Sequence, residues 1–171
     1  MNDEVAYNGW LKIIVRHIGN RSYDILKDHD AVAAIITNHA NEILLVKQFR
    51  PALMKETLEI PAGTIDNLYE NKIDCVIREL KEETGLEIPQ DLIRPVLLYQ
   101  PNVGFSDRTM NLFHVQLNTA EHGSYVIRDE DVSEIIWLKI TDLAKMIDSG
   151  EILDVKTIIA YLYLNQNTRK I

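Results

Sequence analysis

Three glutamates in the middle of the chain, Glu79, Glu82 and Glu83, have the spacing at which side chains share one face of a helix. Carboxylates this close repel one another, and the nearby helix C-terminus also disfavours negative charge. Arg78 can pair with Glu82, but one guanidinium leaves two carboxylates uncompensated. Because clustered oxygen ligands suit Mg²⁺ or Mn²⁺, the pattern indicates a metal site that would also attract a phosphate compound. A solvated helix face is the alternative.

The residues around these glutamates have the pattern of an amphipathic helix. Apolar side chains recur at i, i+3, i+4 and i+7 at Ile73, Val76, Ile77 and Leu80. Gly85 stands where a glycine commonly ends a helix in the left-handed conformation. We therefore predict a helix within residues 71–84, with its apolar stripe against a core and its carboxylates beside that stripe.

The order of residues around this helix resembles the signature of the Nudix family. The run Arg78–Leu86 matches the core of that signature, Arg-Glu-apolar-x-Glu-Glu-x-Gly-apolar, and Glu70 stands eight positions before Arg78. Gly63 supplies the leading glycine. The family has five residues between that glycine and the first glutamate, whereas this chain has six, Thr64–Tyr69. The loop before the helix is therefore expected to bulge by one residue.

The resemblance implies which residues do the chemistry. The metal ligands would be the three helix glutamates and the main-chain carbonyl of Ala62. Metals held there would neutralise a diphosphate and lower the pKa of a bound water. Glu83 or a loop carboxylate would orient or deprotonate this water, and Arg78 would hold the carboxylates in place. In related enzymes an acidic loop supplies the loop carboxylate, for which Glu130 is the candidate here and Asp131 the next; a solvated loop is the alternative.

A second resemblance concerns the substrate. The runs Val46–Pro51 and Glu56–Gly63 are similar to the ADP-ribose pyrophosphatase branch of the family. In that branch the arginine that matches Arg50 contacts the substrate, and the glutamate that matches Glu59 lies in the substrate region. The residues themselves show only a charged pair that flanks a Pro-Ala-Gly turn.

The loop over residues 100–108 resembles the Pro-Gly-Phe-Ser-Asp-Glu loop of ADP-ribose and nucleoside-diphosphate-sugar hydrolases. Loops on a rigid scaffold often carry specificity, so Gly104, Ser106 and Arg108 are substrate-binding candidates. Arg108 stands where many relatives have a glutamate.

These features predict metal-dependent hydrolysis of the diphosphate bond of a nucleoside diphosphate linked to a sugar. The leading substrate is ADP-ribose, which would give AMP and ribose 5-phosphate, with Mg²⁺ as cofactor and Mn²⁺ as a possible replacement. Other nucleotide sugars, UDP-glucose or GDP-mannose, are the alternative within the enzyme class. A ligand-sensing Nudix module that binds without cleaving is the alternative outside it, and the presence of all three glutamates favours the enzyme.

The remaining elements predict a mixed α/β (α+β) architecture, which the resemblance makes the Nudix fold: a mixed β-sheet between helices, with an N-terminal antiparallel hairpin. Strands are predicted at 11–17, 21–27, 31–37, 42–49, 93–99, 110–116 and 133–139. Two later helices are predicted at 141–149, capped by Thr141, and 155–166, capped by Asp154. A polar turn is predicted over 118–124.

The composition of the chain limits the classes of binding partner and the cellular compartments that it suits. With 171 residues, 46% hydrophobic and 26% charged, the chain suits one globular domain, and its net charge of −8 argues against broad nucleic-acid binding. No run approaches the roughly 18 apolar residues of a membrane span. The single Cys75 fits a reducing compartment, so we predict a cytoplasmic protein.

We predict a division into an N-terminal hairpin segment over 1–28 and a Nudix domain over 29–171. The N-terminal segment resembles one that relatives use to form homodimers, so a homodimer is expected. Tyr7 and Trp10 are large apolar groups for a free end and should pack against something.

Overall fold

The centre of the fold is a strand that is buried on both faces. The computed structural model describes residues 2–67, 69–117 and 127–168. All eight residues of β4 (Ala31–Asn38) are buried, as their unbroken apolar run predicts. β4 runs parallel to β9 (Met110–Leu117), while the other pairings of the sheet are antiparallel. The predicted mixed sheet is therefore confirmed.

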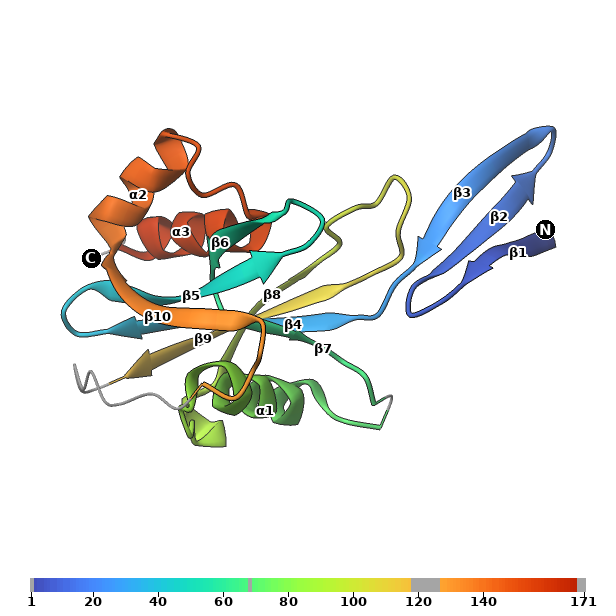
Figure 1. Cartoon of the computed structure of the whole chain (residues 1–171). Helices are drawn as coiled ribbons and strands as arrows, with labels where there is room; N and C mark the ends of the chain where they lie inside the picture. Colours follow the sequence, from blue (N-terminus) through green and yellow to red (C-terminus); the bar gives the residue numbers. More distant parts are fainter. Residues whose placement is uncertain (1, 68, 118–126, 169–171) are drawn as a thin grey trace.

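The sheet has seven strands, in the order β10-β5-β4-β9-β8, with β6 added to β5 and β7 added to β4 (Figure 1). The remaining strands of this sheet are β5 (Glu42–Arg50), β6 (Lys55–Glu59), β7 (Ala62–Thr64), β8 (Arg94–Tyr99) and β10 (Val132–Lys139). β6 and β7 are not predicted from the sequence, because they are short and each owes its extended form to pairing with a neighbouring strand.

β4 and β5 separate beyond their turn. They pair at Thr37 and Ile43, after which β7 lies along β4 and β6 along β5. The chain between β6 and β7 crosses this gap and is held by a hydrogen bond from Ala34 N to Pro61 O (2.9 Å). Residues 59–62 are thus fixed at the point where the sheet opens.

Helices cover both faces of the sheet (Figure 1). α1 (Lys72–Thr84) covers one face, and α2 (Ile140–Asp148) and α3 (Val155–Thr168) cover the other. Alternate residues of β4 serve the two cores: Ala34 lies in the core with Val76 and Leu80 of α1, and Ile35 in the core with Leu143 of α2. A short 3₁₀ helix, η1 (Gln90–Leu92), follows α1.

Local signals set most helix ends. The Asn71 side chain caps α1 by accepting hydrogen bonds from the Ile73 and Asp74 amides, and Gly85 ends it with φ 71°. Asp154 caps α3 as predicted, because its Oδ2 accepts from Thr157 N (3.0 Å).

The predicted cap of α2 by Thr141 is wrong. β10 leads directly into α2 at Ile140, and the side chain of the N-cap residue, Lys139, makes no capping hydrogen bond with the part of the chain that the structure describes. The Ile140 amide instead donates to Asn41 O in the turn between β4 and β5 (3.3 Å). A distant main-chain acceptor therefore takes the place of a local cap.

The N-terminus forms a separate antiparallel sheet that projects from the body (Figure 1). The predicted hairpin is confirmed as β2 (Lys12–Ile18) and β3 (Arg21–Lys27), and β1 (Asn2–Asn8) adds an unpredicted third strand. Tyr7 and Trp10 remain 58% and 68% exposed. The sheet joins the body through Leu26, whose N donates to Phe105 O (2.7 Å).

The polar turn predicted over 118–124 lies outside the described residues. Within those residues, no helix has both the length and the apolar character that a membrane crossing requires.

Candidate active site

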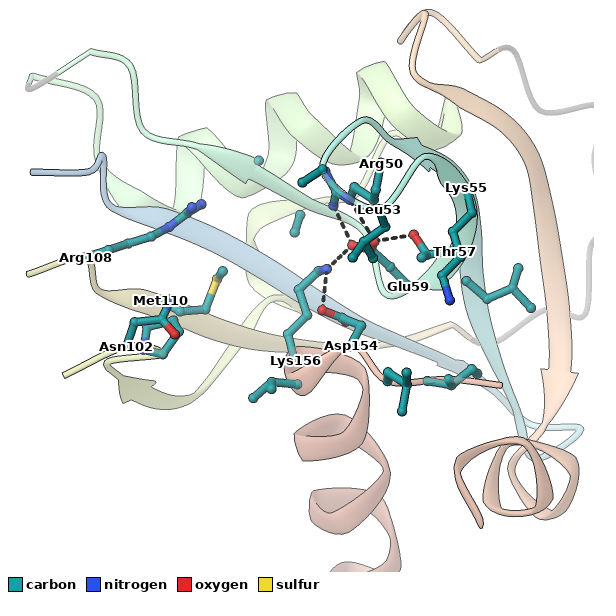
Figure 2. A pocket seen from close by; sticks show the side chains of 18 of the residues that line it. Arg50, Leu53, Lys55, Thr57, Glu59, Asn102, Arg108, Met110, Asp154 and Lys156 are labelled. Carbon is teal, nitrogen blue, oxygen red and sulfur yellow. Dashed lines mark hydrogen bonds and ion pairs between the residues drawn. The ribbon is translucent and has the colours of Figure 1, made fainter. Parts of the chain in front are cut away.

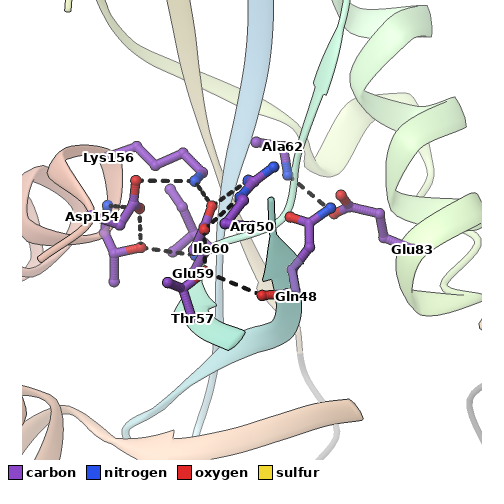
Figure 3. Close-up of polar contacts among 10 residues, drawn as sticks. Gln48, Arg50, Thr57, Glu59, Ile60, Ala62, Glu83, Asp154 and Lys156 are labelled. Atoms are coloured by element: carbon purple, nitrogen blue, oxygen red, sulfur yellow. Dashed lines mark hydrogen bonds and ion pairs between the residues drawn. The ribbon is translucent and has the colours of Figure 1, made fainter. Parts of the chain in front are cut away.

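Two glutamates of α1 reach across to the start of β7. Glu79 and Glu83 are buried, with 8% and 1% exposure. A Cβ added to Gly63 would lie 1.8 Å from Glu79 Cδ, so the Glu79 carboxyl rests on the strand only because residue 63 is glycine. Glu83 Oε2 accepts a hydrogen bond from Ala62 N (3.1 Å; Figure 3). The fold therefore brings these two carboxylates and Ala62, all predicted ligands, to one place.

Arg78 organises the outer side of the cluster. Its guanidinium contacts Glu70 (Nε to Oε1, 3.1 Å), Glu79 (Nη1 to Oε1, 2.7 Å) and Glu82 (Nη1 to Oε2, 3.1 Å). The hydrogen bonds with Glu70 raise the pKa of Arg78. The pair with Glu82 is as the sequence predicts, and Arg78 also contacts Glu79 and Glu70, although its single charge cannot balance three carboxylates. Glu70 meets Arg78 despite the extra residue in the loop after Gly63.

Glu83 and Glu79 are short of positive charge. Burial, together with the charges of Asp129 and Glu79, raises the pKa of Glu83 to about 8 against the hydrogen bond from Ala62, which lowers it. Burial likewise raises the pKa of Glu79, although Arg78 partly opposes this. Buried carboxylates whose pKa values are raised by burial and by neighbouring carboxylates are a donor set that a divalent cation would stabilise.

The oxygen atoms gathered here suit a divalent cation, but side chains alone do not complete the coordination of such an ion. Within the described ranges, no three Asp, Glu, His or Cys side chains are grouped so that they could hold a metal ion. Glu79 and Glu83 offer buried oxygens, whereas Glu82, with 45% of its side chain exposed, pairs with Arg78. A cation at this place would draw on these glutamates, the Ala62 carbonyl and water.

The predicted acidic loop packs on the end of α1. The amides of Arg128 and Asp129 donate to Glu82 O (2.8 and 3.2 Å). Asp129 is the loop residue whose charge raises the pKa of Glu83, whereas the predicted Glu130 is exposed. The Asp131 amide bonds to the Asp129 side chain (2.8 Å). Sequence reasoning found this loop but missed Asp129, because the register of the loop against α1 is a tertiary property.

A pocket of about 640 Å³ lies beside the carboxylate cluster (Figure 2). The connection of β5 to β6, the start of β7, the loop after β8 and the connection of α2 to α3 all contribute to its wall. Of the predicted substrate residues, Arg50, Glu59 and Arg108 line it. Gly104 and Ser106 are not among its lining residues.

The loop over residues 100–108 is fixed to the end of β3. Arg108 Nη1 pairs with Asp28 Oδ2 (3.0 Å), and Lys27 pairs with Asp107. Ser106 is buried, and its Oγ accepts a hydrogen bond from Arg108 N (3.2 Å). Ser106 therefore shapes the main chain that carries Arg108, while Gly104 is exposed.

Arg50 and Glu59 form a bidentate ion pair at the pocket (Figures 2 and 3). Arg50 Nε lies 2.7 Å from Glu59 Oε1, and Nη2 lies 2.5 Å from Oε2. Lys156 of α3 also contacts Glu59 and, through Asp154, belongs to the same network. Sequence reasoning missed Lys156; the one signal is that this lysine is the single charged residue of α3.

Comparison with known proteins agrees with this geometry. The NUDIX domain model matches residues 27–157. The chain is 32% identical over 142 residues to the methanol dehydrogenase activator of Bacillus methanolicus and, separately, to the ADP-ribose pyrophosphatase of Bacillus subtilis. Each match covers 82% of this chain and 75% of the relative. The GDP-mannose pyrophosphatase of Citrobacter koseri is 25% identical over 163 residues, which is 91% of this chain and 81% of that protein. The chain therefore belongs to the Nudix family.

Proposed function

We propose that the protein is a hydrolase that uses a divalent cation to cleave the diphosphate bond of a nucleoside diphosphate sugar. ADP-ribose is the leading substrate, and AMP and ribose 5-phosphate would be its products. The observation that carries the proposal is the placement of Glu79 and Glu83 against Ala62 and Gly63, beside the pocket that contains Arg50. Pyrophosphatases of nucleotide sugars among the relatives support the same reaction.

Mg²⁺ is the proposed cation, since members of the family need a divalent metal and the donors are hard oxygens. When bound, it would neutralise the diphosphate and lower the pKa of a water. Glu79, Glu82, Glu83 and the Ala62 carbonyl would hold it. Arg78 would keep Glu79 and Glu82 in place through its ion pairs with both carboxylates.

The attacking water needs a proton acceptor. Glu83 is the first candidate, because its carboxylate lies buried against Ala62 at the proposed metal site. The acidic loop offers Glu130, as the sequence predicts, and Asp129, whose charge reaches Glu83. On the pocket side, Arg50 and Arg108 would bind the substrate, with Gly104 and Ser106 shaping the loop that carries Arg108.

Product release tests the proposal. ADP-ribose, UDP-glucose and GDP-mannose are incubated with the protein and Mg²⁺, and nucleoside monophosphate is quantified by chromatography. Cleavage of ADP-ribose ahead of the others is expected. Preferred cleavage of another sugar nucleotide would keep the reaction and change the substrate.

A binding-only role is the second candidate, because one relative bears the name of an enzyme activator. Binding of ADP-ribose, measured by calorimetry, without release of any nucleotide product would favour this role and overturn the hydrolase. The predicted cytoplasmic location, without nucleic-acid or membrane partners, remains a prediction.

The N-terminal sheet supports a homodimer as part of the proposal. Its exposed apolar side chains are Val5, Tyr7, Trp10, Ile13, Ile18 and Tyr23. Such a group of side chains on a projecting sheet is typical of a protein interface. Light scattering should find a dimer, which Tyr7→Glu combined with Trp10→Glu should weaken and the exposed control Asp24→Asn should not. A monomeric parent protein would contradict the dimer.

A further inference from the structure

Lys156 at the start of α3 is a buried charge that the reaction scheme above does not use. Its side chain is 8% exposed, although a lysine is rarely buried unless it is paired. Its Nζ contacts the Glu59 carboxylate and lies 3.1 Å from Asp154 Oδ1. Asp154 in turn caps α3. The charge of Lys156 is therefore anchored to the helix end on one side and to the pocket wall on the other.

The Glu59 carboxylate has no accepting capacity left for a substrate. Its Oε1 accepts from Arg50 and from Thr57 Oγ1 (2.6 Å), and its Oε2 accepts from Arg50 and Lys156. A carboxylate has about four acceptor positions, and these four contacts fill them. Glu59 is thus fully engaged with the protein, although it lines the pocket.

Arg50, in contrast, has N–H donors that no side chain among the described residues uses, and these are free for a ligand. A guanidinium has five N–H groups, and Nε and Nη2 each use one on Glu59. The side chain is 38% exposed, lines the pocket, and lies between the Glu59 and Glu83 carboxylates (Figure 3). Its remaining donors therefore face the region between the pocket and the metal-binding glutamates, where a diphosphate would lie.

We propose that Lys156 is a positioning residue that fixes Arg50 for binding of the diphosphate, acting through Glu59; this inference rests on the proposed function. Asp154 and the start of α3 hold Lys156, Lys156 holds Glu59, and the bidentate pair with Glu59 fixes the plane of the Arg50 guanidinium. A preorganised arginine loses less side-chain freedom when the substrate binds. Without Lys156, Glu59 would be a buried carboxylate with one cation instead of two.

A double-mutant cycle on ADP-ribose hydrolysis tests this role. The proteins compared are the parent, Lys156→Met, Arg50→Ala, the double variant and Lys145→Met, a control that alters an exposed lysine of α2. Lys156→Met should raise KM about tenfold while kcat changes less than about threefold, because ground-state binding is lost. The double variant should be no worse than Arg50→Ala alone. An unchanged KM, or losses that multiply in the double variant, would overturn the proposal.

A second readout does not need turnover. The side-chain Nε–Hε signal of Arg50 in nitrogen-15 NMR should exchange slowly with solvent in the parent protein and faster in Lys156→Met, but not in Lys145→Met. A parent that cleaves no nucleotide sugar would refute the proposed function alone. The positioning role would then be decided by this signal together with the Kd for ADP-ribose, and no change in either would overturn it.

If Lys156→Met does not fold, Asp154→Asn replaces it in both measurements. Asparagine can still cap α3, but it loses the ion pair with Lys156. The same rise in KM, but smaller, and the same faster exchange of Arg50 Nε–Hε are expected. Parent values for both measurements in a folded Asp154→Asn would overturn the proposal.

Discussion

Two carboxylates on either side of the crossing between β6 and β7 are buried to the same degree and yet behave in opposite ways. Glu59 is 4% exposed and Glu83 is 1% exposed. Burial alone would raise the pKa of Glu59, but contacts with Arg50 and Lys156 lower it to about 2. The pKa of Glu83 is raised to about 8 because burial is joined by neighbouring negative charge. The charges of the neighbouring groups, and not the degree of burial, decide which of the two carboxylates stays ionised.

The two sites therefore have different uses. The Glu59 carboxylate is balanced by two cations of the protein, Arg50 and Lys156, whereas Glu83 accepts a hydrogen bond from the main-chain amide of Ala62. A buried carboxylate without a cationic partner favours binding of an added cation, whereas a carboxylate that is already paired with protein cations does not. Substitutions at the two positions should accordingly differ in effect: a change at Glu83 should act on catalysis, and one at Glu59 on stability and, through Arg50, on substrate binding.

The largest expected effect is on activity at Glu83. Glu83→Gln should lower kcat/KM for ADP-ribose at least about 100-fold, because it removes a metal ligand and a proton acceptor. Its amide oxygen can still accept from Ala62 N, so the free energy of unfolding should not fall. Steady-state kinetics and urea unfolding measure both, with Glu87→Gln, an exposed glutamate after α1, as the control. A variant with parent activity would remove Glu83 from the site.

The matching change at Glu59 should act on stability. Glu59→Gln should lower the free energy of unfolding by about 3 kcal/mol, because the buried Lys156 loses one of its two carboxylate partners and keeps Asp154 alone. Urea unfolding is compared with Glu56→Gln, which alters an exposed glutamate of the same strand. Equal stability of the two variants would show that the network around Glu59 contributes little to folding.

Acid should affect the protein through Glu59. Its pKa is about 2 in the folded state against an ordinary value of 4.5, so its contribution is complete above pH 4.5 and is lost as the pH falls towards 2. Between neutral pH and pH 3 the loss should be about 2 kcal/mol. Urea unfolding across this range should show a shallower decline in Glu59→Gln. Parallel curves for parent and variant would refute the assignment.

The smallest expected effect is on thermal unfolding with metal. Mg²⁺ should raise the Tm of the parent protein by about 2–5 °C, because it binds the folded state only. Chelation should abolish both this rise and hydrolysis. Calorimetric scans should find the rise diminished in Glu83→Gln and retained in the control Glu87→Gln. A rise that survives in Glu83→Gln would place the cation elsewhere.

Much of the fold could be read from local patterns. The apolar run of β4, the stripe of α1 and the glycine at residue 85 each specify an element without reference to distant residues. Elements that depend on a partner were missed: β1 has a mostly polar sequence, and β7 has three residues. The start of α2 was misplaced because its capping acceptor comes from the turn near Asn41.

By itself, the sequence determined the family signature, the helix that carries Glu79, Glu82 and Glu83, and the two strands at the centre of the sheet, because these follow from local order and periodicity. Only the tertiary structure decided that Arg78 also contacts Glu70, that Asp129 approaches Glu83 and that Lys156 pairs with Glu59. Lys156 lies 97 residues from Glu59 along the chain. The charge balance of a buried carboxylate depends on groups that come into contact only when the chain folds, and these contacts cannot be inferred from the local sequence.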